Sequence, residues 1–350
     1  QLKGNRFSLD VKTFQKIDPK SIDFEIFFKE GFVNFFGPQR FGRFDSPNHE
    51  IGKCILKLEY EMAIDLILKK CINDGLEVSK AKDVWFETKN AEKALEIFPK
   101  FASIEFTLLS GIKKLGEKDS LGAIRSLPRN LRQLYGQSYQ SLLWNIAASE
   151  RIIFSKAGVI LGDLVLVDAN TNVPLNAWDA KWEFDKENIQ IEKDKGGKGQ
   201  GMGRWKKRTS NSEKNKQSIK VCMVEEEDLV QGRFCLEHVV LPLPGCQVEF
   251  PSHFIGTKIL QRLYVDGVHE TMLDGHPQKD FTLMGSYRHL IVKPQNILLN
   301  SVRQESIVEW LKAEFNEKEK NTKEENWVNL SFDLPSSSYA TTLISHISNG

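Results

Sequence analysis

Residues 34–42, with the sequence Asn-Phe-Phe-Gly-Pro-Gln-Arg-Phe-Gly, constrain the fold of this chain more than any other segment. They contain two glycines and three phenylalanines but no aliphatic residue, so they are poorly suited to a hydrophobic core. Glycine permits a positive φ or a close backbone approach, phenylalanine rings can stack on a nucleobase, and the arginine fork suits phosphate. The pattern indicates a rigid binding surface; the alternative is a turn with core aromatics.

The charge of the chain is balanced overall but uneven along its length. The 350 residues, 40% of them hydrophobic, are enough for sizeable cores and for two or three domains. The net charge is only +1, but residues 193–220 carry ten cations and two anions. This segment is also rich in Gly, Asn and Ser, so we expect a mobile basic loop. It is either a solvated insertion or a tether for phosphates.

The cysteines and histidines follow no metal-site or disulfide pattern. The five cysteines are scattered without a Cys-x-x-Cys pair, which favours reduced, intracellular thiols. None of the seven histidines forms a His-x-x-x-His pair with a carboxylate, so no metal ligands are predicted. No apolar run approaches the ~18 residues of a membrane span. We therefore expect neither a metal nor a membrane partner.

Hydrophobic periodicity predicts a mixture of strands and helices. Strands are expected at residues 1–12, 164–167, 239–250, 289–292 and 328–334. Helices are expected at residues 21–35, 52–72, 90–116, 131–154, 256–266, 305–318 and 338–346.

The glycine–aromatic segment resembles the active-site motif of the TruD family of pseudouridine synthases. Further segments agree with this family in the same order along the chain. They are Lys-Gly-Asn-Arg-Phe at 3–7, Leu-Pro-Arg-Asn-Leu at 127–131, Tyr-Gln-Ser at 139–141 with Trp-Asn at 144–145, Ser-Tyr-Arg at 286–288, and Leu-Pro-Ser-Ser-Ser-Tyr-Ala-Thr-Thr at 334–342. Val-Val-Leu-Pro-Leu-Pro-Gly at 239–245 resembles the eukaryotic, pseudouridine synthase 7-like branch. The ordered set spans the whole chain.

The resemblance implies an α+β fold in which one domain interrupts another. A mixed-sheet pseudouridine synthase catalytic domain would consist of residues 1–48 and 289–350. The inserted TRUD domain would comprise residues 49–288 and include the basic loop at 193–220. RNA would bind in a cleft between the two domains.

The implied function is RNA pseudouridine synthesis, the isomerisation of uridine to pseudouridine by a carboxylate nucleophile acting on a flipped-out base. The family acts on tRNA, notably at position 13, and its eukaryotic branch also acts on small nuclear RNA and messenger RNA. The reaction needs no cofactor. RNA is the expected partner, no obligate protein partner is evident, and the nucleus and cytoplasm are both open as locations. The rival interpretation is a non-catalytic RNA-binding protein that retains the fold.

The resemblance also assigns roles to individual residues. Phe36 is expected to be the stacking platform and Asn34 to hold backbone or base through its amide, so both are catalytic candidates. The expected substrate-binding residues are Lys3, Asn5, Gly37, Gln39, Arg40, Phe41, Gly42 and Arg288. Structural support is the alternative for each of these residues, and Tyr139 and Trp144 are expected to lie in the core.

The nucleophile of the family is an aspartate in a Lys-Asp-x-x-Ala-x-Thr segment upstream of the Lys-Gly-Asn strand. Asp119 and Asp280 each follow a lysine, but they lack the Ala and Thr and come after the motif rather than before it. We therefore expect the 350-residue chain to lack its nucleophile segment and to be inactive by itself.

Overall fold

The computed structural model describes residues 4–13, 29–100, 103–156, 158–180, 189–191, 219–269, 273, 275–301 and 326–349. They form two compact units. Unit 1 comprises Gln1–Asn34, Gly158–Val240 and His289–Gly350, and unit 2 comprises Phe35–Ala157 and Leu241–Arg288. Lys3, residues 193–218 of the basic loop and the helix expected at 305–318 lie outside the described residues.

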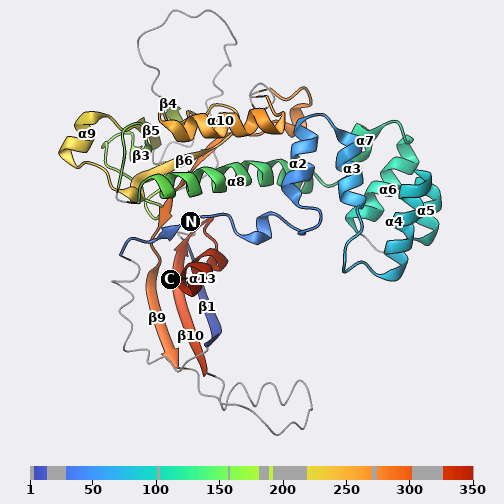
Figure 1. Ribbon diagram of the computed structural model, residues 1–350, viewed down its shortest axis with the longest axis horizontal. Helices are drawn as coiled ribbons and strands as arrows, with labels where there is room; N and C mark the ends of the chain where they lie inside the picture. The colour runs from blue at the N-terminus through green and yellow to red at the C-terminus, as the bar shows by residue number, and fades with distance from the viewer. Residues whose placement is uncertain are drawn as a thin grey trace, which may run out of the picture. The chain divides into compact units, whose positions relative to one another are not determined.

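A three-stranded antiparallel sheet in unit 1 joins the beginning of the chain to its end. Its order is β1 (Gly4–Thr13), β10 (Asn326–Pro335) and β9 (Gln295–Ser301) (Figure 1). The register runs from Gly4 opposite Pro335 to Thr13 opposite Asn326. The strand expected at residues 1–12 is confirmed over its described part, from Gly4 onwards, and so is the strand expected at 328–334. Alternation of apolar and polar residues directs one face of each strand into a core.

That core lies between the sheet and α13 (Ala340–Asn349), where Leu343 packs with Phe332 and Leu334. Phe32 joins the same core from β2 (Phe32–Val33), which pairs with β8 (Ile291–Val292). The helix expected at 21–35 is therefore wrong over its described end. Gly31 has a φ of 73°, and a Cβ there would lie 2.6 Å from the Val292 carbonyl oxygen, so this position favours glycine and ends any helix.

A second sheet has the order β4 (Ile189–Ile191), β5 (Ile219–Met223), β3 (Leu164–Asp168), β6 (Val239–Leu243) and β7 (Ser286–His289). Strand β3 lies in the middle and is almost wholly buried, which explains its unbroken apolar sequence. Between β5 and β6 come the short helices α9 (Glu226–Gln231) and η3 (Leu236–His238). The boundary between the units falls within β6 and β7.

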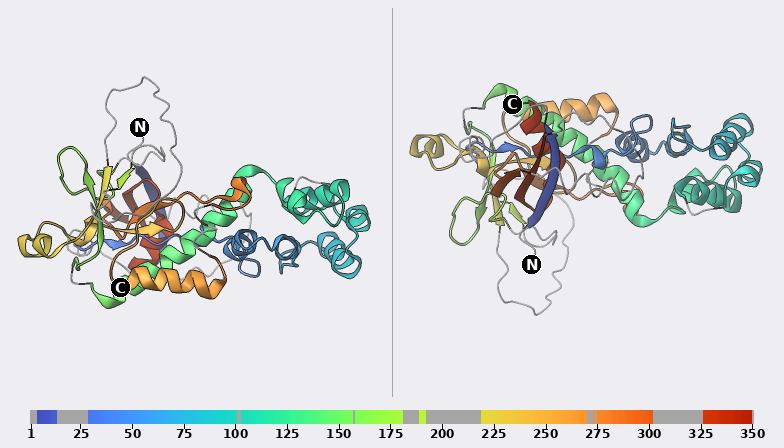
Figure 2. Two further views of the ribbon diagram at one scale, coloured as in Figure 1. Left: turned by 90° about the horizontal axis from the view of Figure 1, so that it is seen from above. Right: turned by 90° about the horizontal axis from the view of Figure 1, so that it is seen from below.

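Helix α8 (Arg129–Phe154) is the central element of unit 2, and at 26 residues it is about 39 Å long. Helix α10 (Phe254–Asp266) lies beside it in every view (Figures 1 and 2), and the Tyr139 hydroxyl donates to Asp266 at 2.9 Å. Helix α2 (Asn48–Leu56) also packs on α8. It does so through Gly52, where a Cβ would lie 2.0 Å from the Tyr135 carbonyl oxygen. Helix α8 is thus the element on which both α2 and α10 pack.

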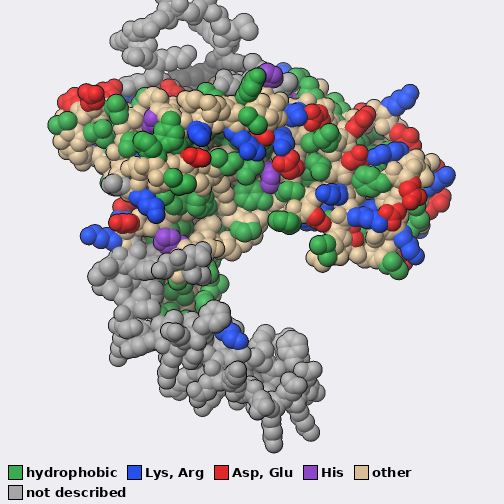
Figure 3. Space-filling model, in the orientation of Figure 1, with side chains coloured by type: hydrophobic (Ala, Val, Ile, Leu, Met, Phe, Trp, Pro, Cys, Tyr) green, Lys and Arg blue, Asp and Glu red, His purple; other side chains and the backbone are tan. Residues whose placement is uncertain are grey.

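The remaining helices of unit 2 form a lobe around an aliphatic core. They are α3 (Tyr60–Leu68), α4 (Leu76–Thr88), α5 (Ala91–Ile97), α6 (Ile104–Leu115) and α7 (Ser120–Arg125). The helices expected at 52–72 and 90–116 are each divided in two. Leu58 adopts a φ of 64° between α2 and α3, and Pro99 follows α5, where proline disfavours a continuing helix. Opposite charges are intermixed over this lobe (Figure 3).

The molecule is therefore a mixed α+β protein, as the resemblance implies. Within the described ranges, every helix is either too short or too polar to cross a lipid bilayer.

Candidate functional site around Phe36

The glycine–aromatic segment folds as a tight turn. Its centre is the short helix η2 (Pro38–Arg40), closed by a hydrogen bond from the Arg40 amide to the Gly37 carbonyl at 3.0 Å. Gly42 has a φ of 71°, and a Cβ there would lie 2.8 Å from the Asn48 side chain, so glycine is required. Gly37 has a φ of −73°, which any residue can adopt. Both glycines were expected to allow the turn, but only at Gly42 does the backbone conformation require a glycine.

Helix α8 fixes the backbone of Phe36. The Phe36 amide donates to the Asn145 side-chain oxygen at 2.9 Å, and the Asn145 amide group donates back to the Phe36 carbonyl at 3.1 Å. The Trp144 ring meets the Phe36 ring edge-on, with centroids 5.8 Å apart and an interplanar angle of 85°. Trp144 is fully buried and its indole N–H donates to the Leu241 carbonyl at 3.2 Å. Phe36 therefore has a defined position while it remains half-buried.

Two guanidinium groups lie over the Phe36 ring. The Arg288 Cζ atom is 4.1 Å from the ring centroid, and the Arg40 Cζ atom is 5.6 Å from it. Arg288 is buried on β7 and also lies 5.4 Å from the Trp144 ring. The negative face of an aromatic ring attracts a cation more strongly when water is excluded. The arrangement therefore places a desolvated positive charge against a flat aromatic surface.

Arg40 is held by polar side chains of α8. Its Nε donates to the Ser141 hydroxyl at 3.1 Å and its Nη2 donates to the Gln137 side-chain oxygen at 3.3 Å. Its carbonyl accepts hydrogen bonds from the Ser138 hydroxyl at 3.1 Å and from the side-chain amide of Asn48 at 3.4 Å. The guanidinium orientation is thus set before any ligand arrives, which lowers the entropic cost of binding an anion.

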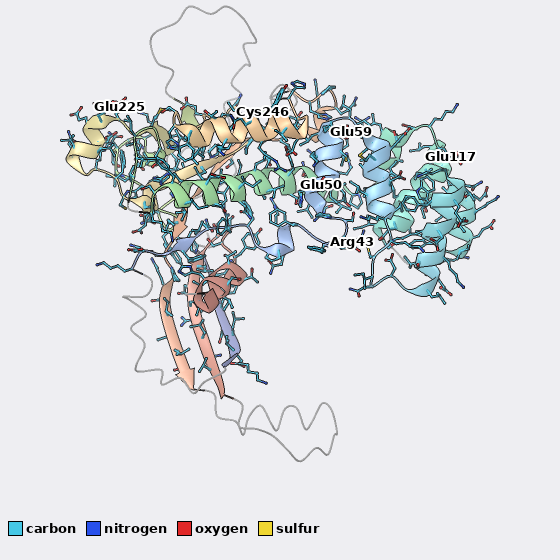
Figure 4. All side chains as sticks on the ribbon, viewed as in Figure 1. Arg43, Glu50, Glu59, Glu117, Glu225 and Cys246 are labelled. Atoms are coloured by element: carbon cyan, nitrogen blue, oxygen red, sulfur yellow. The ribbon has the colours of Figure 1, made fainter. Side chains whose placement is uncertain are left out.

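Two titratable groups beside these residues are uncharged at neutral pH. The imidazole of His49, 5.6 Å from the Phe41 ring, has its pKa lowered chiefly by burial, against the opposing effect of Glu50 (labelled in Figure 4). Burial raises the pKa of Tyr287 to about 12, and its oxygen accepts the Glu249 amide at 2.6 Å. Tyr287 therefore braces β7, the strand that carries Arg288.

The structure brings some of the predicted site residues together. Phe36, Arg40 and Arg288 form one group in unit 2, which we call the Phe36 group. Asn34 belongs to unit 1, where its side-chain amide donates to the His289 carbonyl at 3.2 Å and its backbone amide donates to the Leu290 carbonyl at 2.9 Å. Asn5 is also in unit 1, exposed on β1 opposite Leu334. Gln39 is exposed in the turn, and Gly37 is buried.

Sequence reasoning missed the side chains that hold this group. Gln137, Ser141 and Asn145 are spaced four residues apart and so share one face of α8. A polar stripe within a largely buried helix was the available signal. Trp144 lies in the core as expected, but its ring also forms part of the Phe36 surroundings.

Metal ligands do not gather in the described part of the chain, where no three His, Cys, Asp or Glu side chains could hold an ion. All five cysteines are free thiols.

Comparisons with known proteins agree on one family. The family described as tRNA pseudouridine synthase D (TruD) matches residues 1–237 and 205–347. Multisubstrate pseudouridine synthase 7 of Schizosaccharomyces pombe is 29% identical over 97% of this chain, and the human pseudouridylate synthase 7 homolog is 29% identical over 85% of it. A probable tRNA pseudouridine synthase D of Thermococcus gammatolerans is 34% identical over 57% of this chain and 48% of its own length.

A solved structure shows the same fold. The crystal structure of the putative tRNA pseudouridine synthase D from Methanosarcina mazei aligns with a TM-score of 0.64 and 22% identity, covering 97% of this chain and 67% of that one. The chain spans 48% of the length of the fission-yeast relative and 37% of the human one.

Proposed function

We propose that this chain, which belongs to the TruD family of tRNA pseudouridine synthases, is part of an enzyme that isomerises uridine to pseudouridine in RNA. In this reaction the N1–C1′ bond of a uridine breaks, a C5–C1′ bond forms, and the C5 hydrogen leaves as a proton while N1 gains one. The uridine must leave its stack before a protein can reach these atoms. A protein surface that receives the extruded base is therefore a requirement of the reaction.

The observation that carries this proposal is the Phe36 group. Phe36 is half-buried, fixed through both its backbone polar groups, and covered by the buried guanidinium of Arg288. A base that stacks on Phe36 either meets a ring polarised by Arg288 from the opposite side or takes the place of that guanidinium. In both arrangements Arg288 lies close to the uracil or its phosphate, where its donors suit carbonyl and phosphate oxygens.

The other predicted site residues complete the proposal. Phe36 receives the base and Asn34 positions the backbone that leads into the motif. The substrate contacts are assigned to Arg40 and Arg288 for phosphate or uracil oxygens and to Gln39 for the flanking strand. Gly37, Phe41 and Gly42 shape the turn, while Lys3 and Asn5 extend the RNA-binding surface. The nucleophile expected from the family is an aspartate of the Lys-Asp-x-x-Ala-x-Thr type, which no residue of the printed sequence matches.

The proposed substrates are uridines of tRNA, including position 13, and of small nuclear and messenger RNA in the nucleus or cytoplasm. The description of the fission-yeast relative as multisubstrate supports the wider range.

We also propose that residues 1–48 and 289–350 form the catalytic domain and residues 49–288 the inserted domain. The pairing of β1 with β10 supports a shared body for the two end segments, and limited proteolysis with mass spectrometry tests the boundaries.

A tritium-release assay tests the function. The full-length protein is incubated with a tRNA transcript that carries tritium at C5 of its uridines, and each isomerisation releases one tritium into water. We expect release to exceed one equivalent of enzyme and to fall in a Phe36→Ala variant. Tight RNA binding by the full-length wild type without any release would instead favour a non-catalytic RNA-binding protein.

A further inference from the structure

Phe44 is the most exposed of the large hydrophobic side chains that the structure describes, with a relative exposure of 102%. It lies two residues beyond Gly42, the last residue of the turn, and belongs to the same compact unit as the Phe36 group. Scattered surface hydrophobics are ordinary, but a fully exposed phenylalanine beside a binding segment is a candidate for contact with a ligand.

The backbone that carries Phe44 is fixed on both sides. Arg43, labelled in Figure 4, donates from Nη1 to the Glu105 carboxylate and from Nη2 to the Ile67 carbonyl, both at 3.3 Å. On the other side the Ser46 hydroxyl donates to the Leu66 carbonyl at 2.5 Å. The loop thus holds the ring in solvent without leaving its backbone free, which reduces the entropy lost when a ligand stacks on it.

Two arginines precede Phe44 in the same segment. Arg40 and Arg43 lie on its N-terminal side and Asp45 follows it. Arg43 pairs with Glu105, while the buried Lys82 pairs with both Glu105 and Asp74. Phe44 lies eight positions after Phe36, so their Cα atoms are at most about 28 Å apart. Cations interleaved with exposed aromatic rings are the combination that binds single-stranded nucleic acid.

We propose that Phe44 is a second stacking site, which receives an unpaired base of the RNA strand flanking the target uridine. This inference rests on the proposed function, because it requires that the RNA strand bound at the Phe36 group continues past η2 towards Phe44. Stacking on an aromatic ring tolerates any base, so Phe44 adds affinity without choosing the modified position. A protein partner or a second copy of the chain is the competing occupant, and the test distinguishes it.

The test measures binding of a fluorescein-labelled, unmodified tRNA transcript to the full-length protein by fluorescence anisotropy. The variants are Phe44→Ala, Phe44→Leu and Phe44→Trp. The matched control is Tyr264→Ala, which removes another exposed aromatic ring from the same unit. We expect Phe44→Ala and Phe44→Leu to weaken binding by about 5- to 150-fold, while Phe44→Trp and Tyr264→Ala bind as the wild type does.

Turnover separates this inference from the proposed function. At saturating transcript, Phe44→Ala should release tritium at the wild-type rate, with an unchanged melting temperature because the ring is exposed. Wild-type affinity in Phe44→Ala, or equal affinities of the leucine and tryptophan variants, overturns the stacking role while the synthase activity stands. A Phe44→Ala variant that changes the oligomeric mass in light scattering but not the RNA affinity overturns it in favour of a protein contact. Absence of both binding and turnover in the wild type overturns the proposed function itself.

Discussion

The Phe36 group and the aliphatic core of the helical lobe belong to the same compact unit, yet they are held together in different ways. The lobe depends on fully buried apolar side chains such as Leu108 and Leu109, which contact one another without directional bonds. The Phe36 group depends on directional contacts: two hydrogen bonds between Phe36 and Asn145, one donated by each residue, an edge-on indole and a guanidinium over the ring.

The difference separates stability from ligand recognition. Burial of apolar surface contributes most of the folding free energy and depends little on orientation. Hydrogen bonds and cation–π contacts each contribute less to net stability but set where a side chain points. Substitutions in the lobe should therefore reduce stability, and substitutions in the Phe36 group should mainly reduce activity.

The strongest test of this comparison is a substitution in the lobe. Leu108→Ala should lower the free energy of unfolding by about 2–5 kcal/mol, since it removes buried methylene groups and leaves a cavity. Urea unfolding followed by circular dichroism measures this loss. Leu115→Ala, on the same helix but 45% exposed, is the matched control and should change stability by less than ~0.5 kcal/mol. Equal losses in the two variants would show that the lobe is not the stabilising core.

The second test removes the ring of the Phe36 group. Phe36→Ala in the full-length protein should slow turnover by about 5- to 150-fold, which corresponds to a lost stacking contact of ~1–3 kcal/mol. Phe36→Tyr keeps the aromatic face and serves as the control in the tritium-release assay. Unchanged turnover in Phe36→Ala, or a loss of melting temperature as large as that of Leu108→Ala, would assign Phe36 to packing.

The third test loosens the backbone of the same residue. Asn145→Ala removes both hydrogen bonds to Phe36 and should cost ~1–3 kcal/mol, at ~0.5–1.5 kcal/mol for each bond. Because the ring then loses its fixed position, turnover should fall by a larger factor than affinity for RNA. Asn130→Ala, an exposed position on the same helix, controls for helix propensity and should leave turnover unchanged. A variant that loses stability but keeps wild-type turnover would contradict a positioning role.

The smallest expected effect comes from an ion pair at the lobe. Hydrogen bonds from Arg125, and then from Arg132, lower the pKa of Asp280 to about 2 from its ordinary value of 3.8, although burial opposes them. The folded-state pKa is the lower one, so this stabilisation is present above about pH 4 and is lost as the pH falls towards 2. For such a solvent-accessible pair it should be below ~1 kcal/mol. Melting temperatures of wild type and Asp280→Asn should differ at pH 7 and converge near pH 2; a constant difference would exclude the pair as its cause.

Several features could be predicted from the sequence because their causes are local. Alternation in β1 and β10 indicated strands, and the long periodic segment from Leu131 indicated α8. Gly42 marked a position that requires a positive φ. The prediction failed where the helices at 52–72 and 90–116 were expected to be continuous. The periodic pattern continues through Pro99, which interrupts the second helix. Leu58 adopts a positive φ although it is not a glycine, so no residue type in the sequence marked the break in the first helix.

The sequence by itself determined the family, the mixed α+β composition and the residues of the aromatic turn, because these follow from motifs and from periodicities of two and 3.6 residues. Only the tertiary structure decided that Arg288 covers Phe36, that Asn145 holds its backbone, and that Phe44 remains in solvent. The physical reason is that periodicity depends only on residues close together in the sequence. The contacts around Phe36 instead join segments far apart in the chain and depend on how α8 and β7 pack.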